Sequence, residues 1–181
     1  GTIIRGDLLL LLYGLDLLEK AGPGQTMIFD VKCSQAVPEV FARHGGKPIM
    51  WKTGHSLIKE KMKETGAPLA GELSGHVCFA DDFYGFDDAL YAAARLVDLV
   101  ARSPQPLSER TAGFPAYVST PEIRVDVPEE EKFEIVRRAA EHFGREHQVI
   151  DGDGARVLFQ DGWGLLRASN TQPVLVLRYE E

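Results

Sequence analysis

The sequence predicts an α/β domain, with a mixed sheet and flanking helices, followed by a small α+β domain with a largely antiparallel sheet. Short apolar runs alternate with helix-length amphipathic segments in the first part of the chain, as in helices packed on a sheet. After a stretch rich in proline and glycine, closely spaced short strands replace that alternation. The 181 residues suffice for both domains to bury a core, and we place the domains at residues 1–108 and 112–181.

In the first domain, hydrophobic periodicity separates helices from strands. Apolar residues recur at helical spacing between Leu90 and Val100, whereas Met27 to Val31 is a nearly continuous apolar run typical of a buried strand. Gly22 and Pro23 end the first helix. We expect helices at residues 8–20, 37–44, 56–64 and 87–102, and strands at 25–31, 48–51, 68–73 and 76–79.

Residues 103–115 contain three prolines and are expected to form a linker. The strict alternation of residues 123–127 then predicts a half-exposed strand. A helix is expected over 128–143, with proline near its start and Gly144 at its end. The remaining strands are predicted at residues 148–150, 156–160, 163–167 and 174–179.

Composition excludes several classes of protein. There are 20 basic and 27 acidic residues, so the formal charge of −7 repels nucleic-acid phosphates and argues against a general nucleic-acid partner. The most apolar segment, residues 8–13, resumes irregularly as far as Leu18; it is too short to cross a membrane and fits a buried helix better than a signal peptide. Cys33 and Cys78 show neither metal spacing nor a disulfide framework, which favours a cytoplasmic location. The first residue is Gly1, so either an initiator was removed or the chain was cut from something longer.

The most suggestive short segment is 71–76, Gly-Glu-Leu-Ser-Gly-His. Its two glycines allow close approach of the backbone to a ligand. If the segment is extended, Glu72 and Ser74 point the same way, and both can accept hydrogen bonds from sugar hydroxyls. The alternative is a β-turn whose polar residues are simply solvated.

A second polar segment, residues 167–173, lies between two predicted strands. Arg167 can bind a phosphate through two charge-assisted hydrogen bonds, and Ser169, Asn170 and Thr171 could satisfy the remaining oxygens. The alternative is a polar hairpin loop closed by Pro173.

Lys32 and His55 each follow a predicted strand. Ligands of α/β sheets collect at the carboxyl ends of strands, so Lys32 is placed for an anion or a hydroxyl group. His55 opens a helix whose N-terminus would attract phosphate. The alternatives are an exposed lysine and a structural histidine. Cys33 is interpreted as a packed thiol.

Two acidic segments raise the question of a metal site. Asp151 and Asp153 are separated by one glycine, but the next residues form a strand, so a tight turn is the better interpretation. A metal-dependent phosphatase that uses these two carboxylates is a weaker alternative. Asp87 and Asp88 fit acidic residues at a helix start.

Taken in order, four segments resemble the α-D-phosphohexomutase family, in its bacterial phosphomannomutase/phosphoglucomutase branch. They are residues 30–34, 51–56, 71–76 and 167–173. The resemblance runs across essentially the whole chain but covers only the third and fourth domains of the family, the fourth having a TATA-box-binding-protein-like fold. One departure is Leu73, where this branch usually carries methionine.

The resemblance assigns roles to individual residues. It implies that Glu72 and Ser74 bind hexose hydroxyls, and that His76 is a candidate for proton transfer. Lys32 and His55 would line the same cleft, with Lys32 a second candidate for a catalytic role. The phosphate-binding loop would comprise Arg167, Ser169, Asn170 and Thr171. Asp151 begins a turn that mimics the metal loop of the family, but it lies in the wrong domain, so no metal ligand is expected in this chain.

The implied reaction interconverts hexose 1-phosphate and 6-phosphate, with glucose or mannose as the sugar, through a bisphosphorylated intermediate. The phosphoserine loop and the Mg²⁺ loop of this isomerase would lie in two N-terminal domains that this chain lacks. We therefore expect the isolated chain to be inactive, and we expect its two domains to close over one monosaccharide, Glu72 on the ring and Arg167 on the phosphate. The alternative from another class is a non-catalytic module that binds sugar phosphates or a partner.

Overall fold

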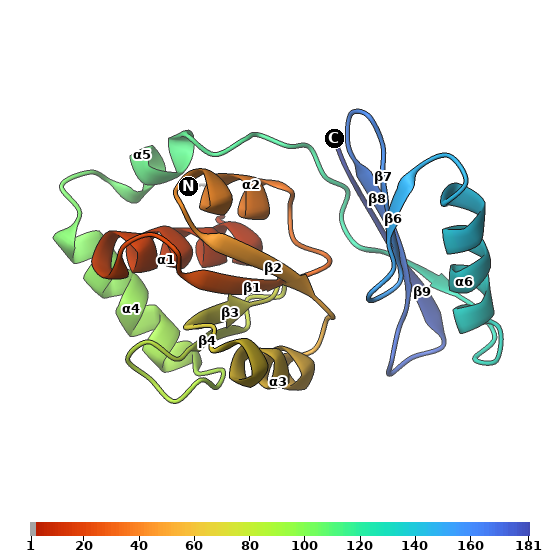
Figure 1. The fold of residues 1–181 in the computed structure, drawn as a ribbon, viewed down its shortest axis with the longest axis horizontal. Helices are drawn as coiled ribbons and strands as arrows, with labels where there is room; N and C mark the ends of the chain where they lie inside the picture. Colours follow the sequence, from red (N-terminus) through yellow and green to blue (C-terminus); the bar gives the residue numbers. More distant parts are fainter. Residues whose placement is uncertain (1–2) are drawn as a thin grey trace. The chain divides into compact units, whose positions relative to one another are not determined.

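The computed structural model describes residues 3–181 and separates into two compact units, Gly1–Ala116 and Tyr117–Glu181 (Figure 1). The first unit has a mixed sheet with helices on both of its faces. The second has a five-stranded antiparallel sheet and one long helix. The predicted fold class is therefore confirmed.

The helices and strands of the first unit follow the predicted order closely. The elements are α1 (Gly6–Ala21), β1 (Thr26–Asp30), α2 (Ala36–Arg43), β2 (Lys47–Trp51), α3 (His55–Thr65), β3 (Leu69–Gly71), β4 (Val77–Phe79), α4 (Ala89–Arg102) and α5 (Leu107–Ala112). The strand order is β2-β1-β3-β4, with β1 parallel to β2 and β3, and β4 antiparallel to β3. The three parallel strands therefore all end, at their carboxyl termini, on the same side of the sheet.

Alternation along β1 divides the core between the two faces of this sheet. Met27 and Phe29 pack with α1 and α2, whereas Ile28 faces the opposite way and packs with Ile58 and Met62 of α3. Successive side chains of a strand point to opposite faces, so an apolar strand requires cover on both. The continuous apolar run of this strand is explained by that arrangement.

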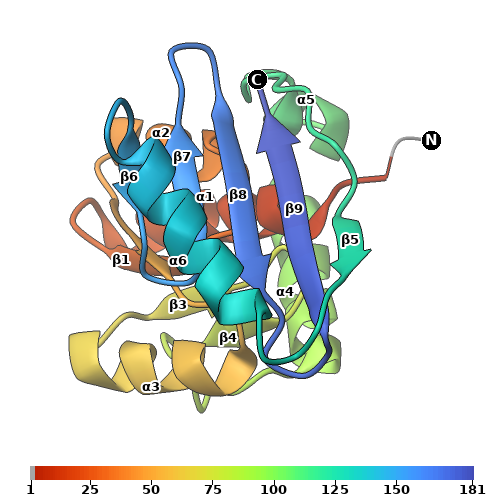
Figure 2. The ribbon, with the colours of Figure 1, turned by 90° about the vertical axis from the view of Figure 1, so that its right-hand side faces the viewer.

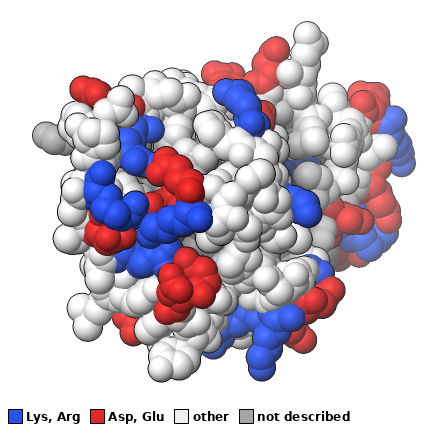
Figure 3. All heavy atoms as spheres, turned by 60° about the vertical axis from the view of Figure 1, so that its left-hand side comes forward, with Lys and Arg blue, Asp and Glu red and all other residues white. Residues whose placement is uncertain are grey.

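The segment expected to be a linker is more ordered than predicted. Residues 107–112 form the short helix α5, and its Arg110 donates to Glu19 of α1 at 2.8 Å. Further ion pairs join α1 to α4, including Arg102 to Asp16 at 2.7 Å. Figure 3 shows acidic and basic side chains intermixed on this side of the molecule. Proline content alone therefore overestimated the length of the linker.

The second unit contains β5 (Ile123–Asp126), α6 (Lys132–Phe143), β6 (Gln148–Ile150), β7 (Ala155–Leu158), β8 (Trp163–Ala168) and β9 (Val174–Glu180). The strand order is β5-β9-β8-β7-β6, and every pairing is antiparallel. Figure 2 shows α6 crossing one face of this sheet. The predicted antiparallel sheet is therefore confirmed.

Two details of the second unit differ from the prediction. The helix α6 begins at Lys132 and not at Pro128, because Glu131 N–H bonds to the Pro128 carbonyl at 3.0 Å and closes a turn first. The strand β5 is exposed along all four residues and not half-exposed. It is an edge strand that pairs only with β9, so alternation in sequence did not produce alternation in burial.

Candidate functional site

A buried carboxylate, Asp30, joins the loops that follow the three parallel strands of the first unit. Its Oδ1 accepts from Leu73 N–H at 3.0 Å and from the Cys33 thiol at 2.9 Å. Its Oδ2 accepts from the Thr53 hydroxyl at 3.2 Å, and the residue is 0% exposed. The loops after β1, β2 and β3 are therefore fixed to one side chain. Asp30 begins the segment 30–34 noted in the sequence, but no role was predicted for this residue.

Lys32 provides a positive charge beside that buried carboxylate. Its Nζ lies 3.7 Å from Asp30 Oδ2, and its side chain is only 11% exposed. A buried charge is tolerated when it is paired and hydrogen-bonded. Lys32 is consequently not the exposed lysine of the alternative interpretation, and it lies at the strand edge where a ligand is expected.

Glu72 binds the N-terminus of α3. Its Oε1 accepts from Gly54 N–H at 2.7 Å, and the residue is 4% exposed. Gly54 has φ of 129°, a conformation that residues with a Cβ rarely adopt. One N–H group at this helix N-terminus, that of Gly54, is therefore already used by the carboxylate of Glu72.

The segment from Glu72 to His76 is a turn and not an extension of the flanking strands. Glu72 N–H donates to His76 O, and Gly75 N–H donates to Glu72 O, both at 2.9 Å. The period-two argument for Glu72 and Ser74 thus does not apply, and Ser74 is exposed whereas Glu72 is buried. A Cβ on Gly6 would lie 2.5 Å from Leu73 O, so the start of α1 contacts this turn directly.

His76 is oriented by the carboxylate of Asp87, a residue that was predicted only to lie at the start of a helix. Its Nδ1 forms a short hydrogen bond with Asp87 Oδ2, while Asp87 Oδ1 accepts from Val77 N–H at 3.3 Å. Because a carboxylate only accepts, Nδ1 carries the proton and Nε2 is the ring nitrogen left for a ligand. The His55 and His76 rings lie 6.1 Å apart. Asp88 is the N-cap of α4, as predicted, and accepts from Tyr91 N–H at 2.8 Å.

In the second unit, Arg167 on β8 already has an anionic partner. Its Nε lies 3.2 Å from Asp153 Oδ2 and its Nη2 lies 3.4 Å from Asp153 Oδ1. Asp153 belongs to the predicted tight turn between β6 and β7. Gly154 has φ of 93°, and a Cβ there would lie 2.5 Å from Arg167 Cβ. The turn thus brings a carboxylate to the arginine, a contact that spacing alone did not indicate.

The loop after β8 contains the other predicted phosphate-binding residues. Ser169 is 8% exposed and its N–H donates to Val174 O at 3.0 Å, while its hydroxyl accepts from Thr171 N–H at 3.3 Å. Asn170 and Thr171 are exposed. This loop therefore presents polar groups to solvent from a hydrogen-bonded frame.

Metal-ligating side chains are not clustered in the described part of the chain. Within residues 3–181, there is no group of three or more His, Cys, Asp or Glu side chains that could hold a metal ion. These side chains therefore do not fit a Mg²⁺ site. No helix among the same residues is both long and apolar enough to span a membrane.

The two units together define a class of protein with an α/β/α domain, polar loops at its strand ends and a following α+β domain. Residues 5–117 match the family model for phosphoglucomutase/phosphomannomutase, alpha/beta/alpha domain III. Residues 122–181 match the model for the C-terminal domain of the same family. The chain belongs to the phosphoglucomutase/phosphomannomutase family.

Individual relatives agree with this assignment. The chain is 49% identical over 183 residues to a phosphomannomutase/phosphoglucomutase of Pseudomonas putida, covering 99% of this chain and 39% of the relative. It is 47% identical over 184 residues to a phosphoglucomutase of Neisseria gonorrhoeae, with the same coverage. A solved phosphoglucomutase/phosphomannomutase family protein of Burkholderia thailandensis superposes with a TM-score of 0.86 at 46% identity, covering 99% of this chain and 38% of that one. The chain thus spans about two fifths of the length of these relatives.

Proposed function

We propose that this chain is the sugar-phosphate-binding part of a hexose phosphomutase. The complete protein would interconvert hexose 1-phosphate and 6-phosphate, with glucose or mannose as the sugar, through a bisphosphorylated intermediate. One observation carries the proposal: the loops that follow β1, β2 and β3 are all attached to Asp30. This attachment gathers Lys32, His55 and the turn with Glu72 at the carboxyl ends of the three strands.

In the first unit, Glu72 and Ser74 would accept hydrogen bonds from ring hydroxyls. Glu72 is held by Gly54 N–H, so its carboxylate is ordered before a ligand arrives, and less conformational entropy is lost on binding. Lys32 and His55 would bind the same ligand. His76, with Nδ1 held by Asp87, would take at Nε2 the proton of the sugar hydroxyl group that attacks the phosphoryl group.

In the second unit, Arg167 would bind the phosphate, with Ser169, Asn170 and Thr171 around the remaining oxygens. The contact between Arg167 and Asp153 has long distances for a charged pair, which is consistent with a carboxylate that a phosphate can replace.

The chemistry of phosphoryl transfer requires groups beyond these. Mg²⁺ would neutralise charge on the transferred phosphoryl group, and we propose that its ligands and the phosphoserine belong to preceding domains of the full-length protein. The isolated chain would then bind ligand weakly and show no mutase activity. We also propose a cytoplasmic location, which is supported by the buried thiols of Cys33 and Cys78.

Binding can be tested on the isolated chain by nuclear magnetic resonance titration with glucose 1-phosphate and mannose 1-phosphate. Arg167→Ala should weaken binding by about 1.5–3 kcal/mol, the contribution of a charge-assisted hydrogen bond. Asp153→Asn should strengthen it, because the carboxylate no longer competes for Arg167. Arg138→Ala, on the exposed surface of α6, is the control.

Two results would contradict the proposal. Unchanged affinity in Arg167→Ala would remove the phosphate-binding role of that residue. Formation of glucose 6-phosphate from glucose 1-phosphate by this chain at enzymatic rates would refute its expected inactivity. If a high concentration of either sugar phosphate shifts no amide signals in either unit, this result would favour a module that binds some other partner.

A further inference from the structure

We infer that Lys132, the first residue of α6, is a positioning residue that fixes the phosphate-binding loop before a ligand arrives. This inference rests on the proposed function, because it concerns residues 169–172 of the same loop. Lys132 itself would not contact the ligand. It would act by holding the backbone of the loop in the conformation that binds phosphate.

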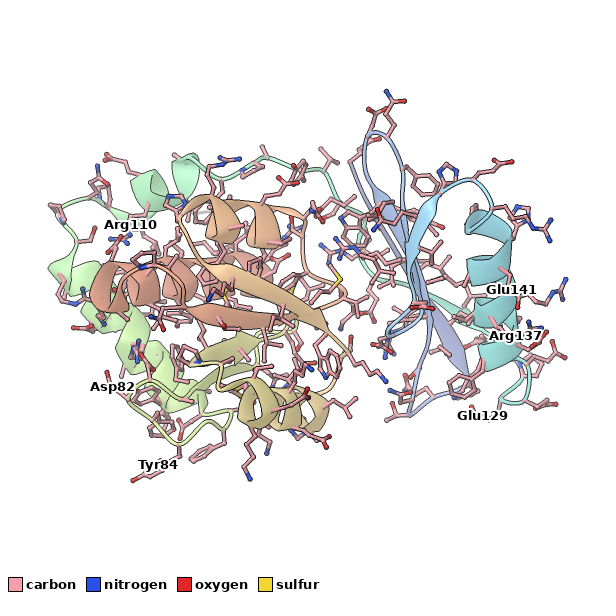
Figure 4. The ribbon with its side chains drawn as sticks, in the orientation of Figure 1. Asp82, Tyr84, Arg110, Glu129, Arg137 and Glu141 are labelled. Carbon is pink, nitrogen blue, oxygen red and sulfur yellow. The ribbon has the colours of Figure 1, made fainter. Side chains whose placement is uncertain are left out.

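The ammonium group of Lys132 binds both ends of that loop. Nζ donates to Ser169 O at 2.7 Å and to Gln172 O at 3.3 Å, and it also contacts Glu129 Oε1 at 2.6 Å. The side chain of Lys132 is only 1% exposed. Figure 4 shows Glu129 in the segment just before α6. One buried cation therefore joins the start of α6 to a loop 37 residues later in the chain.

The placement of this lysine is energetically unfavourable unless the loop contacts offset it. A positive charge in the first turn of a helix opposes the helix dipole. Lysine is also almost never fully buried without partners. The two carbonyls and the Glu129 carboxylate supply those partners, so the stability of the loop and the burial of Lys132 depend on each other.

The direction of the loop carbonyls determines where its donors point. A trans peptide places N–H opposite the preceding C=O, and the described chain has no cis peptide. Because Ser169 O faces Lys132, the N–H of Asn170 points away from the lysine. Pro173, which follows the other bound carbonyl, has no N–H. Ser169 N–H and Val174 N–H are already used within the loop frame. Lys132 thus leaves Asn170 N–H directed outward as a donor for an anion.

The test compares charge-removing variants of the whole 181-residue chain. Lys132→Met removes the ammonium group at similar volume, and Lys132→Gln retains one donor group. Arg138→Gln removes one positive charge from the exposed surface of α6, and Glu129→Gln removes the partner that lies outside the loop. Each variant is titrated with glucose 1-phosphate and with inorganic phosphate, while amide hydrogen exchange of residues 169–174 and thermal unfolding are followed.

For Lys132→Met we expect about tenfold weaker binding of both probes, as for loss of one charge-assisted hydrogen bond, and faster exchange at Ser169 and Val174. Lys132→Gln should fall between this variant and the native chain. Glu129→Gln should weaken binding only slightly, because the two loop carbonyls still hold the ammonium group, and Arg138→Gln should bind as the native chain does. The intermediate variant keeps the test decisive if Lys132→Met does not fold.

Three outcomes would overturn the inference. One is native affinity in a folded Lys132 variant. Another is an equal loss of affinity in Arg138→Gln, which would indicate a general effect of net charge. A third is weaker binding with unchanged hydrogen exchange in the loop. If Arg167→Ala also binds normally, the proposed function fails together with the inference; if only Arg167→Ala loses binding, the inference alone fails.

Discussion

Replacing Asp30 by asparagine should destabilise the first unit and loosen all three strand-end loops. The asparagine side chain would keep one oxygen acceptor, so it can retain the bond from Leu73 N–H at best, while the Thr53 hydroxyl loses its acceptor. Lys32 would also lose its carboxylate partner. Each hydrogen bond to a charged group contributes about 1.5–3 kcal/mol, so we expect a loss of about 2–4 kcal/mol in the free energy of unfolding.

Urea unfolding followed through resolved amide signals of each unit measures this loss separately for the two units. The signals of residues 53 and 73 should shift most, since their hydrogen-bond partner has changed. Asp82→Asn, on an exposed loop labelled in Figure 4, is the matched control and should leave the unfolding curve unchanged. A change below about 0.5 kcal/mol in Asp30→Asn, the size of an ordinary surface substitution, would refute the role assigned to this carboxylate.

Three further predictions concern other parts of the first unit. Asp87→Ala should shift the ring-nitrogen signals of His76 in nitrogen-15 spectra away from the form protonated at Nδ1; an unchanged spectrum would exclude Asp87 as the partner. Burial raises the pKa of the Cys78 thiol to about 11, so iodoacetamide at pH 8 should leave it unmodified until the protein unfolds, and rapid labelling of the native chain would contradict this. Burial would raise the pKa of Asp81, but hydrogen bonds from Arg95 outweigh it and hold that pKa below its ordinary value. At a pH above the ordinary carboxyl pKa, Asp81→Asn should therefore lower the free energy of unfolding by about 2 kcal/mol. This difference from the native chain should vanish as the pH falls through the lowered pKa of Asp81. A difference that stays constant with pH would count against the ion pair.

Local signals in the sequence were sufficient for most elements of the fold. The apolar run ending at Val31 predicts a buried strand because both faces of β1 are covered, and Asp88 predicts the start of α4 because it caps that helix. Where local signals gave a wrong prediction, contacts with distant parts of the chain determined the structure. The alternating pattern of β5 cannot reveal that it lies at a sheet edge, and a proline-rich segment cannot show that Arg110 will reach Glu19.

The candidate site was predictable in its residue types but not in its connections. Lys32, Glu72 and Arg167 were selected for their position after or within strands. The partners of Glu72 and Arg167 were missed because they come from distant parts of the sequence or from turns with another local explanation. Glu72 and Gly54 are 18 residues apart, and Arg167 and Asp153 are 14 apart. A single sequence contains no signal for such pairs until the register of the strands is known.

The two buried charges that hold the candidate loops, Asp30 and Lys132, have opposite signs, and each sign suits the ligand group proposed for its loop. Asp30 takes up donors, the N–H of Leu73 and the hydroxyl of Thr53, and thereby fixes a turn whose Glu72 and Ser74 oxygens can accept from sugar hydroxyls. Lys132 takes up acceptors, two carbonyls of the loop after β8, and we infer that it thereby directs a backbone donor toward an anion. In the proposed function, a charge that does not touch the ligand determines in each unit whether the loop presents acceptors or donors. Binding of an anionic sugar phosphate by an acidic chain would then depend on the buried partner of each loop and not on the net charge of the surface.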